Sequence, residues 1–174
     1  MKTVKLLTML CFTVLAATVQ AGVAIQHWVA PSGARVFFVE NHDLPILDVN
    51  VDFAAGTSFD PPGKAGVAAL TQAVIDLGAQ GMDETEIANR MADLGAQLSG
   101  GVDMDRASLG LRTLSVAEKS EPALDVLRAV LVAPSFQRDV FEREKARAVA
   151  ALKEALTRPD SIASKHFWAA MYPG

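Results

Sequence analysis

Cysteine is almost missing from this chain of 174 residues, which holds only Cys11. One cysteine forms no disulfide within a chain and is too little for a zinc site built from thiolates. Histidine is also scarce, and His27, His42 and His166 are not spaced as metal ligands along the chain. We interpret these three histidines as scattered surface residues. The alternative is that they bind a metal.

Clusters of basic residues are lacking as well. The chain has 16 lysines and arginines against 20 acidic residues, which gives a formal net charge of −4. Proteins that bind nucleic acid neutralise phosphates with grouped lysines and arginines. The composition therefore predicts no nucleic acid partner.

Long apolar runs are lacking after the first residues of the chain. Residues 1–21 have the pattern of a secretory signal peptide, in which two lysines precede the apolar run Leu6–Ala17 and small residues allow cleavage after Ala21. That run is too short to span a bilayer. The product, residues 22–174, is expected to be periplasmic or secreted, without a membrane span and without a thiol. A buried first helix is the alternative.

The remaining sequence has alternating strand and helix patterns. Residues 46–53 alternate apolar and polar side chains, which is typical of a strand with one face in a core. Strands are predicted at 25–30, 35–39, 46–53, 96–104 and 106–113, and helices at 66–77, 83–94, 115–132, 137–157 and 160–172. This order predicts one α+β domain, a mixed but mainly antiparallel sheet with helices on one face.

Local signals predict the helix ends. They are Gly78 as a left-handed cap, Asp83 with Glu86 and Ser115 with Glu118 as capping boxes, Pro122 in a first turn, and Asp160 as the cap of the last helix.

Five phrases in this order carry a family resemblance. They are Phe53–Ser58, Pro61–Gly66, Glu86-Ile87 with Leu94–Ser99, Phe141–Arg147 and Met171–Gly174. Over residues 26–174 they resemble the N-terminal domain of the insulinase/pitrilysin family of inverted-motif zinc peptidases, and bacterial processing-peptidase-like members in particular. The resemblance implies that residues 22–174 form this domain, incomplete at its C-terminus, as in a fragment or a truncated reading frame.

The zinc motif of the family is degenerate in this chain. The motif H-x-x-E-H falls on Ala69–Ala73, so the resemblance places its two histidines on Ala69 and Ala73 and its catalytic glutamate on Gln72. The third ligand of the family falls on Ala151, two helical turns after the acid that Glu144 matches. Alanine offers zinc no donor, and a carboxamide is no general base. We therefore expect no catalytic residue, no metal and no cofactor, although active family members use zinc.

The resemblance also implies a peptide-binding edge strand at Ala96, Gln97, Leu98 and Ser99. Peptides add to such an edge through backbone groups, so this function does not depend on the metal. Gly100 and Gly101 allow the other interpretation, a bulge or turn at this place. The chain also resembles family members that lack the zinc motif. That resemblance implies that this chain is the peptide-binding subunit of a heterodimer with an active, zinc-bearing homologue.

Several alternatives stay open at this level. Asp76 is a solvated acid at a helix end or a substitute carboxylate, and Glu144 is an exposed charge or a remnant of the site. Ala148, Ala151 and Ala155 form a small-residue stripe on which the emptied site is expected to collapse. The rival functions are an active zinc peptidase with substitute ligands, a stand-alone peptide-binding module, and a truncation product.

Overall fold

The computed structural model describes residues 23–172, so the predicted signal peptide lies outside the described residues. The chain divides into two units at Leu44 and Pro45. The first unit contains an antiparallel hairpin of β1 (Ile25–Val29) and β2 (Arg35–Val39), in which Ile25 pairs with Val39 and Val29 with Arg35. The turn between these strands contains Gly33 at φ +86°, a conformation that favours glycine.

The second unit is built on a three-stranded antiparallel sheet in the order β3-β7-β6. Its strands are β3 (Ile46–Phe53), β6 (Gln97–Val102) and β7 (Ala107–Leu114). Leu47, Val49 and Val51 of β3 are half-buried while the residues between them are exposed, which confirms the alternation predicted for 46–53. The central strand is β7, whose Leu109 and Leu111 are buried in the core.

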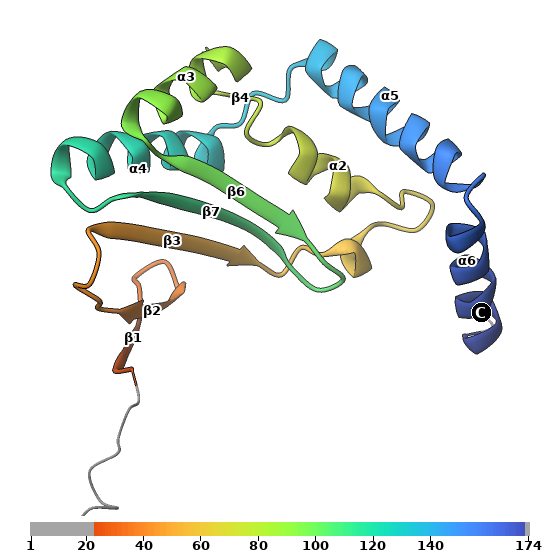
Figure 1. Ribbon diagram of the computed structural model, residues 1–174, viewed down its shortest axis with the longest axis horizontal. Helices are drawn as coiled ribbons and strands as arrows, with labels where there is room; N and C mark the ends of the chain where they lie inside the picture. Colours follow the sequence, from red (N-terminus) through yellow and green to blue (C-terminus); the bar gives the residue numbers. More distant parts are fainter. Residues whose placement is uncertain (1–22, 173–174) are drawn as a thin grey trace, which may run out of the picture. The chain divides into compact units, whose positions relative to one another are not determined.

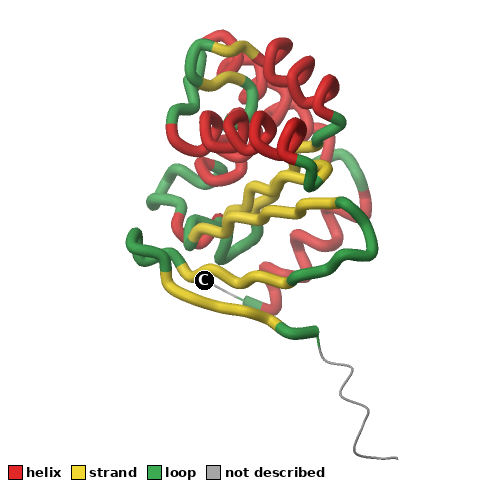
Figure 2. Tube along the Cα trace, turned by 90° about the vertical axis from the view of Figure 1, so that its left-hand side faces the viewer, coloured by secondary structure: helices red, strands yellow, loops and turns green. Residues whose placement is uncertain are grey.

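Helices cover one face of this sheet, as predicted (Figure 1). The helices that contact the sheet are α2 (Val67–Val74), α3 (Glu84–Leu94) and α4 (Ala117–Val132). The helix α5 (Arg138–Ala155) packs on α2, and α6 (Pro159–Met171) follows it. The core joins Leu109 and Leu111 to apolar residues of α3 and α4: Ile87, Met91, Ala123, Val126, Leu127, Ala129 and Val130. Seen from the side, α3 and α4 lie above the strands of the sheet (Figure 2). The α+β class is thereby confirmed.

The prediction at the end of α2 is wrong. That helix ends at Val74 instead of Leu77, and a small hairpin of β4 (Gly78–Ala79) and β5 (Met82–Asp83) follows it. Gly78 is a buried residue of β4 and not a left-handed cap. Ser135 donates its N–H to the carbonyl of Gly78 at 2.9 Å, and a Cβ at Gly78 would collide with the Ser135 hydroxyl. A contact 57 positions away in the chain, invisible to local signals, therefore decides this structure.

The capping predictions have mixed outcomes. Asp83 does accept a hydrogen bond from the Glu86 N–H at 2.8 Å, which confirms the start of α3. The N-caps of α4 and α6 are Val116 and Arg158, and neither makes a side-chain capping bond. The capping box predicted at Ser115 and the cap predicted at Asp160 are therefore wrong. Pro122 lies inside α4 and not in its first turn. Packing against the sheet, and not capping, places α4.

None of the helices among residues 23–172 has both the length and the apolar character needed to cross a membrane.

Candidate functional site

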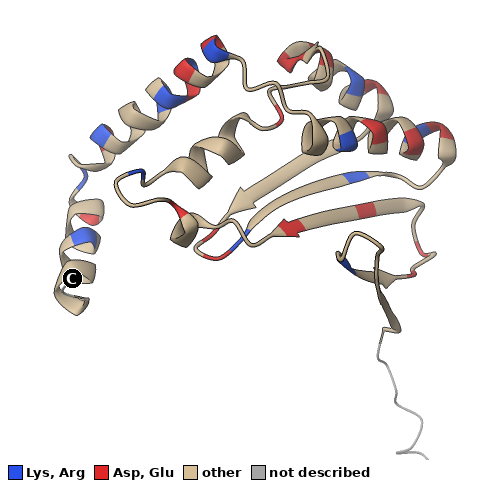
Figure 3. Ribbon diagram, turned by 180° about the vertical axis from the view of Figure 1, so that it is seen from behind, with Lys and Arg blue, Asp and Glu red and all other residues tan. Residues whose placement is uncertain are grey.

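The degenerate motif lies on α2, and a loop residue fixes the start of this helix. The Asp60 carboxylate accepts hydrogen bonds from the N–H groups of Gly66 at 2.6 Å and Ala68 at 2.8 Å. Gly66, the N-cap, takes φ +100°, which favours glycine. A carboxylate at a helix N-terminus satisfies free N–H groups and the helix dipole. The helix itself carries no charged residue, in contrast to α3 and α5 (Figure 3).

The predicted ligand positions lie on two helices that contact each other, α2 and α5. Ala69 and Ala73 on α2 and Ala151 on α5 are exposed, and Gln72 is half-buried. The expected collapse onto the alanine stripe is therefore wrong, because Ala148 and Ala151 are exposed and only Ala155 is half-buried. The alanine methyl groups offer no donor, so the residues at these positions do not fit zinc.

Glu144 is engaged in an ion-pair network instead of standing free. Its side chain is only 14% exposed and accepts bonds from Arg143 Nε at 2.8 Å and Arg147 at 2.7 Å. Arg143 also contacts Glu84 at the start of α3, at 2.6 Å. The hydrogen bond from Arg143 holds the pKa of Glu144 below its ordinary value. The interpretation of Glu144 as an exposed charge is therefore wrong, because its carboxylate joins α5 to α3 through Arg143.

The pKa of Asp76, just after α2, is shifted in the opposite direction to that of Glu144. Asp76 is half-buried, and burial is the main cause that raises the pKa of its carboxyl above the ordinary value. The negative charge of Glu84 raises it further, against the lowering effect of a backbone hydrogen bond. Asp76 is thus not the fully solvated acid that the sequence favoured. Within residues 23–172, no three histidines, cysteines or acids are grouped to hold a metal ion.

The predicted peptide-binding strand lies at the edge of the sheet. Gln97, Leu98 and Ser99 belong to β6, which among residues 23–172 pairs with β7 alone. Ala96 precedes the strand and donates its N–H to the Met91 carbonyl. The register runs without interruption from Gln97 opposite Arg112 to Val102 opposite Ala107. Gly100 and Gly101 are therefore ordinary positions of the strand, and the bulge or turn interpretation is wrong.

The hydrogen-bonding pattern shows which backbone groups of β6 point outward. The Asp103 N–H donates to the Arg106 carbonyl across the β6–β7 turn at 2.9 Å. Neighbouring residues of an antiparallel strand alternate between bonding the partner and pointing away. Gly101, Ser99 and Gln97 thus bond β7, whereas Val102, Gly100 and Leu98 turn their N–H and C=O groups to the free edge. Sequence reasoning named Leu98 but missed Gly100 and Val102, because register decides the alternation.

Gln72, at the position predicted for the catalytic base, reaches this same strand. A Cβ placed on Gly100 would collide with Nε2 of Gln72 and would lie 2.7 Å from the backbone oxygen of Ser108. A Cβ on Gly101 would meet nothing within 4 Å. The structure thus brings the carboxamide of Gln72 to the side-chain position of Gly100, 28 residues away in the chain.

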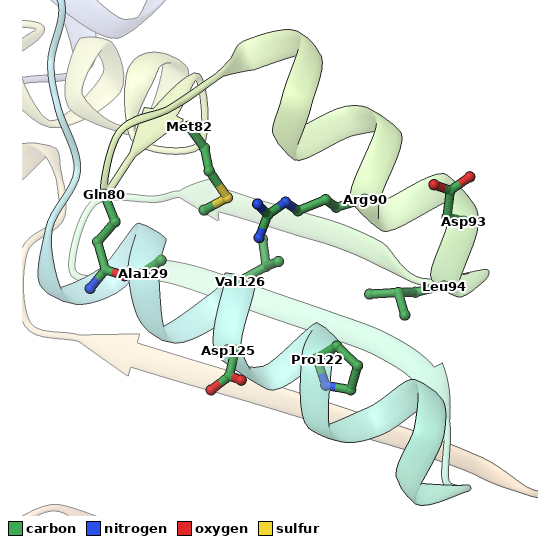
Figure 4. A pocket seen from close by; sticks show the side chains of 9 residues that line it. All are labelled: Gln80, Met82, Arg90, Asp93, Leu94, Pro122, Asp125, Val126 and Ala129. Carbon is green, nitrogen blue, oxygen red and sulfur yellow. The ribbon is translucent and has the colours of Figure 1, made fainter.

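Two hollows lie elsewhere on the second unit. A groove of about 330 Å³ between α3 and α4 has Met82, Val126 and Ala129 among its apolar lining and Arg90 at its side (Figure 4). Arg90 is paired with Glu86 at 2.8 Å. A second hollow of about 410 Å³ lies beside the β6–β7 turn and is lined by Asn50, Asp52, Gly101, Val102, Asp103, Arg106 and Ser108. Neither hollow includes a residue of the degenerate motif.

Comparison with known proteins identifies the family. The family model of insulinase (peptidase family M16) matches residues 35–174, so the chain belongs to this family. It is similar to a crystal structure of a peptidase M16 inactive domain from Pseudomonas fluorescens, with 38% identity and a TM-score of 0.78. The match covers 82% of this chain and 34% of that one.

A curated relative has the same character. The chain is 25% identical over 128 residues to the non-peptidase homolog YmxG of Helicobacter pylori, a match covering 74% of this chain. The chain spans 29% of the length of that relative.

Proposed function

We propose that this chain is a catalytically silent member of the insulinase family that binds extended peptides along β6. The observation that carries the proposal is the combination of a lost metal site with an unpaired edge. Alanine stands at the three positions assigned to the metal ligands, Ala69, Ala73 and Ala151, and an amide, Gln72, stands at the position assigned to the catalytic base. These changes do not affect the outward backbone groups of β6. The names of the two relatives, an inactive domain and a non-peptidase homolog, support the silent character.

We further propose that the chain works as a heterodimer with an active, zinc-bearing homologue that hydrolyses the bound peptide. Support comes from apolar side chains on the last two helices. Leu152 and Leu156 of α5 and Phe167, Trp168 and Met171 of α6 are exposed, Trp168 by 55%. Exposed apolar side chains grouped on neighbouring turns are typical of surfaces that bind another protein. The predicted signal peptide, residues 1–21, supports assembly in the periplasm or outside the cell.

The test separates peptide binding from hydrolysis. The full chain is purified and its zinc content measured, and binding of labelled, extended peptides is followed by fluorescence anisotropy. We expect no stoichiometric zinc, no cleavage, and binding that is unaffected by a chelator. An N-methylated version of each peptide is the control, because it keeps the side chains but lacks the N–H donors that strand addition requires.

The results distinguish the rival functions. One equivalent of zinc with chelator-sensitive cleavage would establish an active peptidase with substitute ligands. Equal binding of normal and N-methylated peptides would contradict addition to the edge of β6. Size-exclusion chromatography with and without an H-x-x-E-H homologue from the same genome tests the partner. A monodisperse chain that binds peptides, and whose elution is unchanged by the homologue, would instead indicate a stand-alone peptide-binding module.

A further inference from the structure

Gln72 and Gly100 form an unusual pair at the free edge of the sheet. Gly100 turns its N–H and C=O groups outward but has no side chain, and the carboxamide of Gln72 occupies the space where its Cβ would be. The side chain of Gln72 is half-buried, and it comes from α2 on the helix-covered face of the sheet. The carboxamide therefore stands where the side chain of a residue at position 100 would stand.

Strand geometry then determines what the carboxamide meets. Residues directly opposite each other in a pair of strands place their side chains on the same face, with Cβ atoms about 4.5–5.5 Å apart. A peptide residue opposite Gly100 thus directs its side chain toward the helix-covered face, next to Gln72. Its two neighbours in the peptide direct theirs to the other face.

We infer that Gln72 is a specificity-determining residue, which acts as the cross-strand partner that Gly100 lacks and selects a neutral polar side chain at one position of the bound peptide. This inference rests on the proposed binding of peptides to β6. A carboxamide donates and accepts hydrogen bonds, so it pairs with threonine, serine, asparagine or glutamine. An apolar side chain at this position leaves the carboxamide without a partner as the peptide covers it, which carries a desolvation cost.

The lack of charged residues on α2 itself favours a neutral partner. The helix α2 has no charged residue, and the arginines of α5 that lie nearest in sequence to Ala151, Arg143 and Arg147, are bonded to Glu144. Carboxylate and ammonium side chains of a peptide thus find no free opposite charge on α2. The polar side chains of α2 are Thr71 and Gln72, and the carboxamide of Gln72 is the one that reaches Gly100.

The experiment is a threonine-to-valine scan along one extended peptide, because these two side chains have nearly the same shape. Each peptide is titrated against the parent protein and against Gln72→Met, which keeps the length of the side chain and removes its hydrogen bonds. Thr71→Ala is the matched control on the neighbouring exposed position of α2. Gln72→Ala repeats the measurement in case methionine packs differently.

We expect one position of the peptide to prefer threonine by about two- to fivefold in the parent protein, the range of a cross-strand pair. The preference disappears in both Gln72 variants and persists in Thr71→Ala. The positions on either side show no dependence on Gln72.

Peptide binding without any position that depends on Gln72 would overturn this inference and leave the proposed function intact. Absence of peptide binding by the parent protein would overturn both. A preference for threonine that survives in both Gln72 variants would assign the selection to another residue.

Discussion

Gly100 and Gly101 are neighbours of the same type in the same strand, and we expect them to respond to alanine in opposite ways. A Cβ at Gly100 would lie 2.7 Å from the Ser108 backbone oxygen and 3.3 Å from Leu109 Cδ1, besides colliding with Gln72. The amide of Gln72 is the end of a flexible side chain and can move. The Ser108 oxygen belongs to the central strand of the sheet and moves only if the register between β6 and β7 is distorted.

The magnitudes follow from packing and backbone entropy. Forcing an extra methyl group into a filled space typically costs about 1–3 kcal/mol. Gly101→Ala meets nothing within 4 Å, and alanine in a strand is about 0.5–1 kcal/mol better than glycine because less backbone entropy is lost on folding. We therefore expect the free energies of unfolding of the two variants to differ by about 1.5–4 kcal/mol.

Urea denaturation followed by circular dichroism measures this difference, and thermal melting gives a second estimate. For a domain of this size, 2 kcal/mol corresponds to a change in Tm of about 4–8 °C. The double variant Gln72→Ala/Gly100→Ala should recover only the part of the lost free energy of unfolding that is due to the collision with the Gln72 carboxamide. If Gly100→Ala and Gly101→Ala were equally stable, the placement of Gln72 and Ser108 around Gly100 would be refuted.

Three further predictions concern single features of the second unit. The folded chain holds the proton of Asp76 more tightly than the unfolded chain does, so the free energy of unfolding should fall as the pH rises from the ordinary aspartate pKa through the raised one. Denaturation measured across that pH range should show this fall in the parent protein and not in Asp76→Asn. The same pH dependence in both proteins would contradict the burial of Asp76. Thr113→Val should raise the free energy of unfolding by about 1 kcal/mol, since Thr113 Oγ1 is buried with no hydrogen-bond partner among the described residues; destabilisation in urea would point to a partner for this hydroxyl. The triple variant Ala69→His, Ala73→His, Ala151→Glu should bind zinc measurably in calorimetry, because α2 and α5 are in contact. A folded triple variant with the zinc affinity of the parent would show that the assigned register of one helix is wrong.

The sequence by itself determined the features that depend on neighbouring residues or on composition. Period-two alternation predicted β3, and the Asp83 cap, whose bond spans three residues, predicted the start of α3. The sequence was also enough to predict that the positions assigned to the metal ligands, Ala69, Ala73 and Ala151, offer none, because a methyl group has no donor in any conformation.

Only the tertiary structure decided the features made by contacts between distant segments. The β4–β5 hairpin depends on Ser135, and the burial of Glu144 depends on an arginine that also contacts Glu84. The outward direction of Gly100 follows from its pairing with β7, since a shift of one residue reverses every backbone group along the edge. The carboxamide of Gln72 reaches Gly100 because α2 packs against β6, and no pattern within either segment contains that distance.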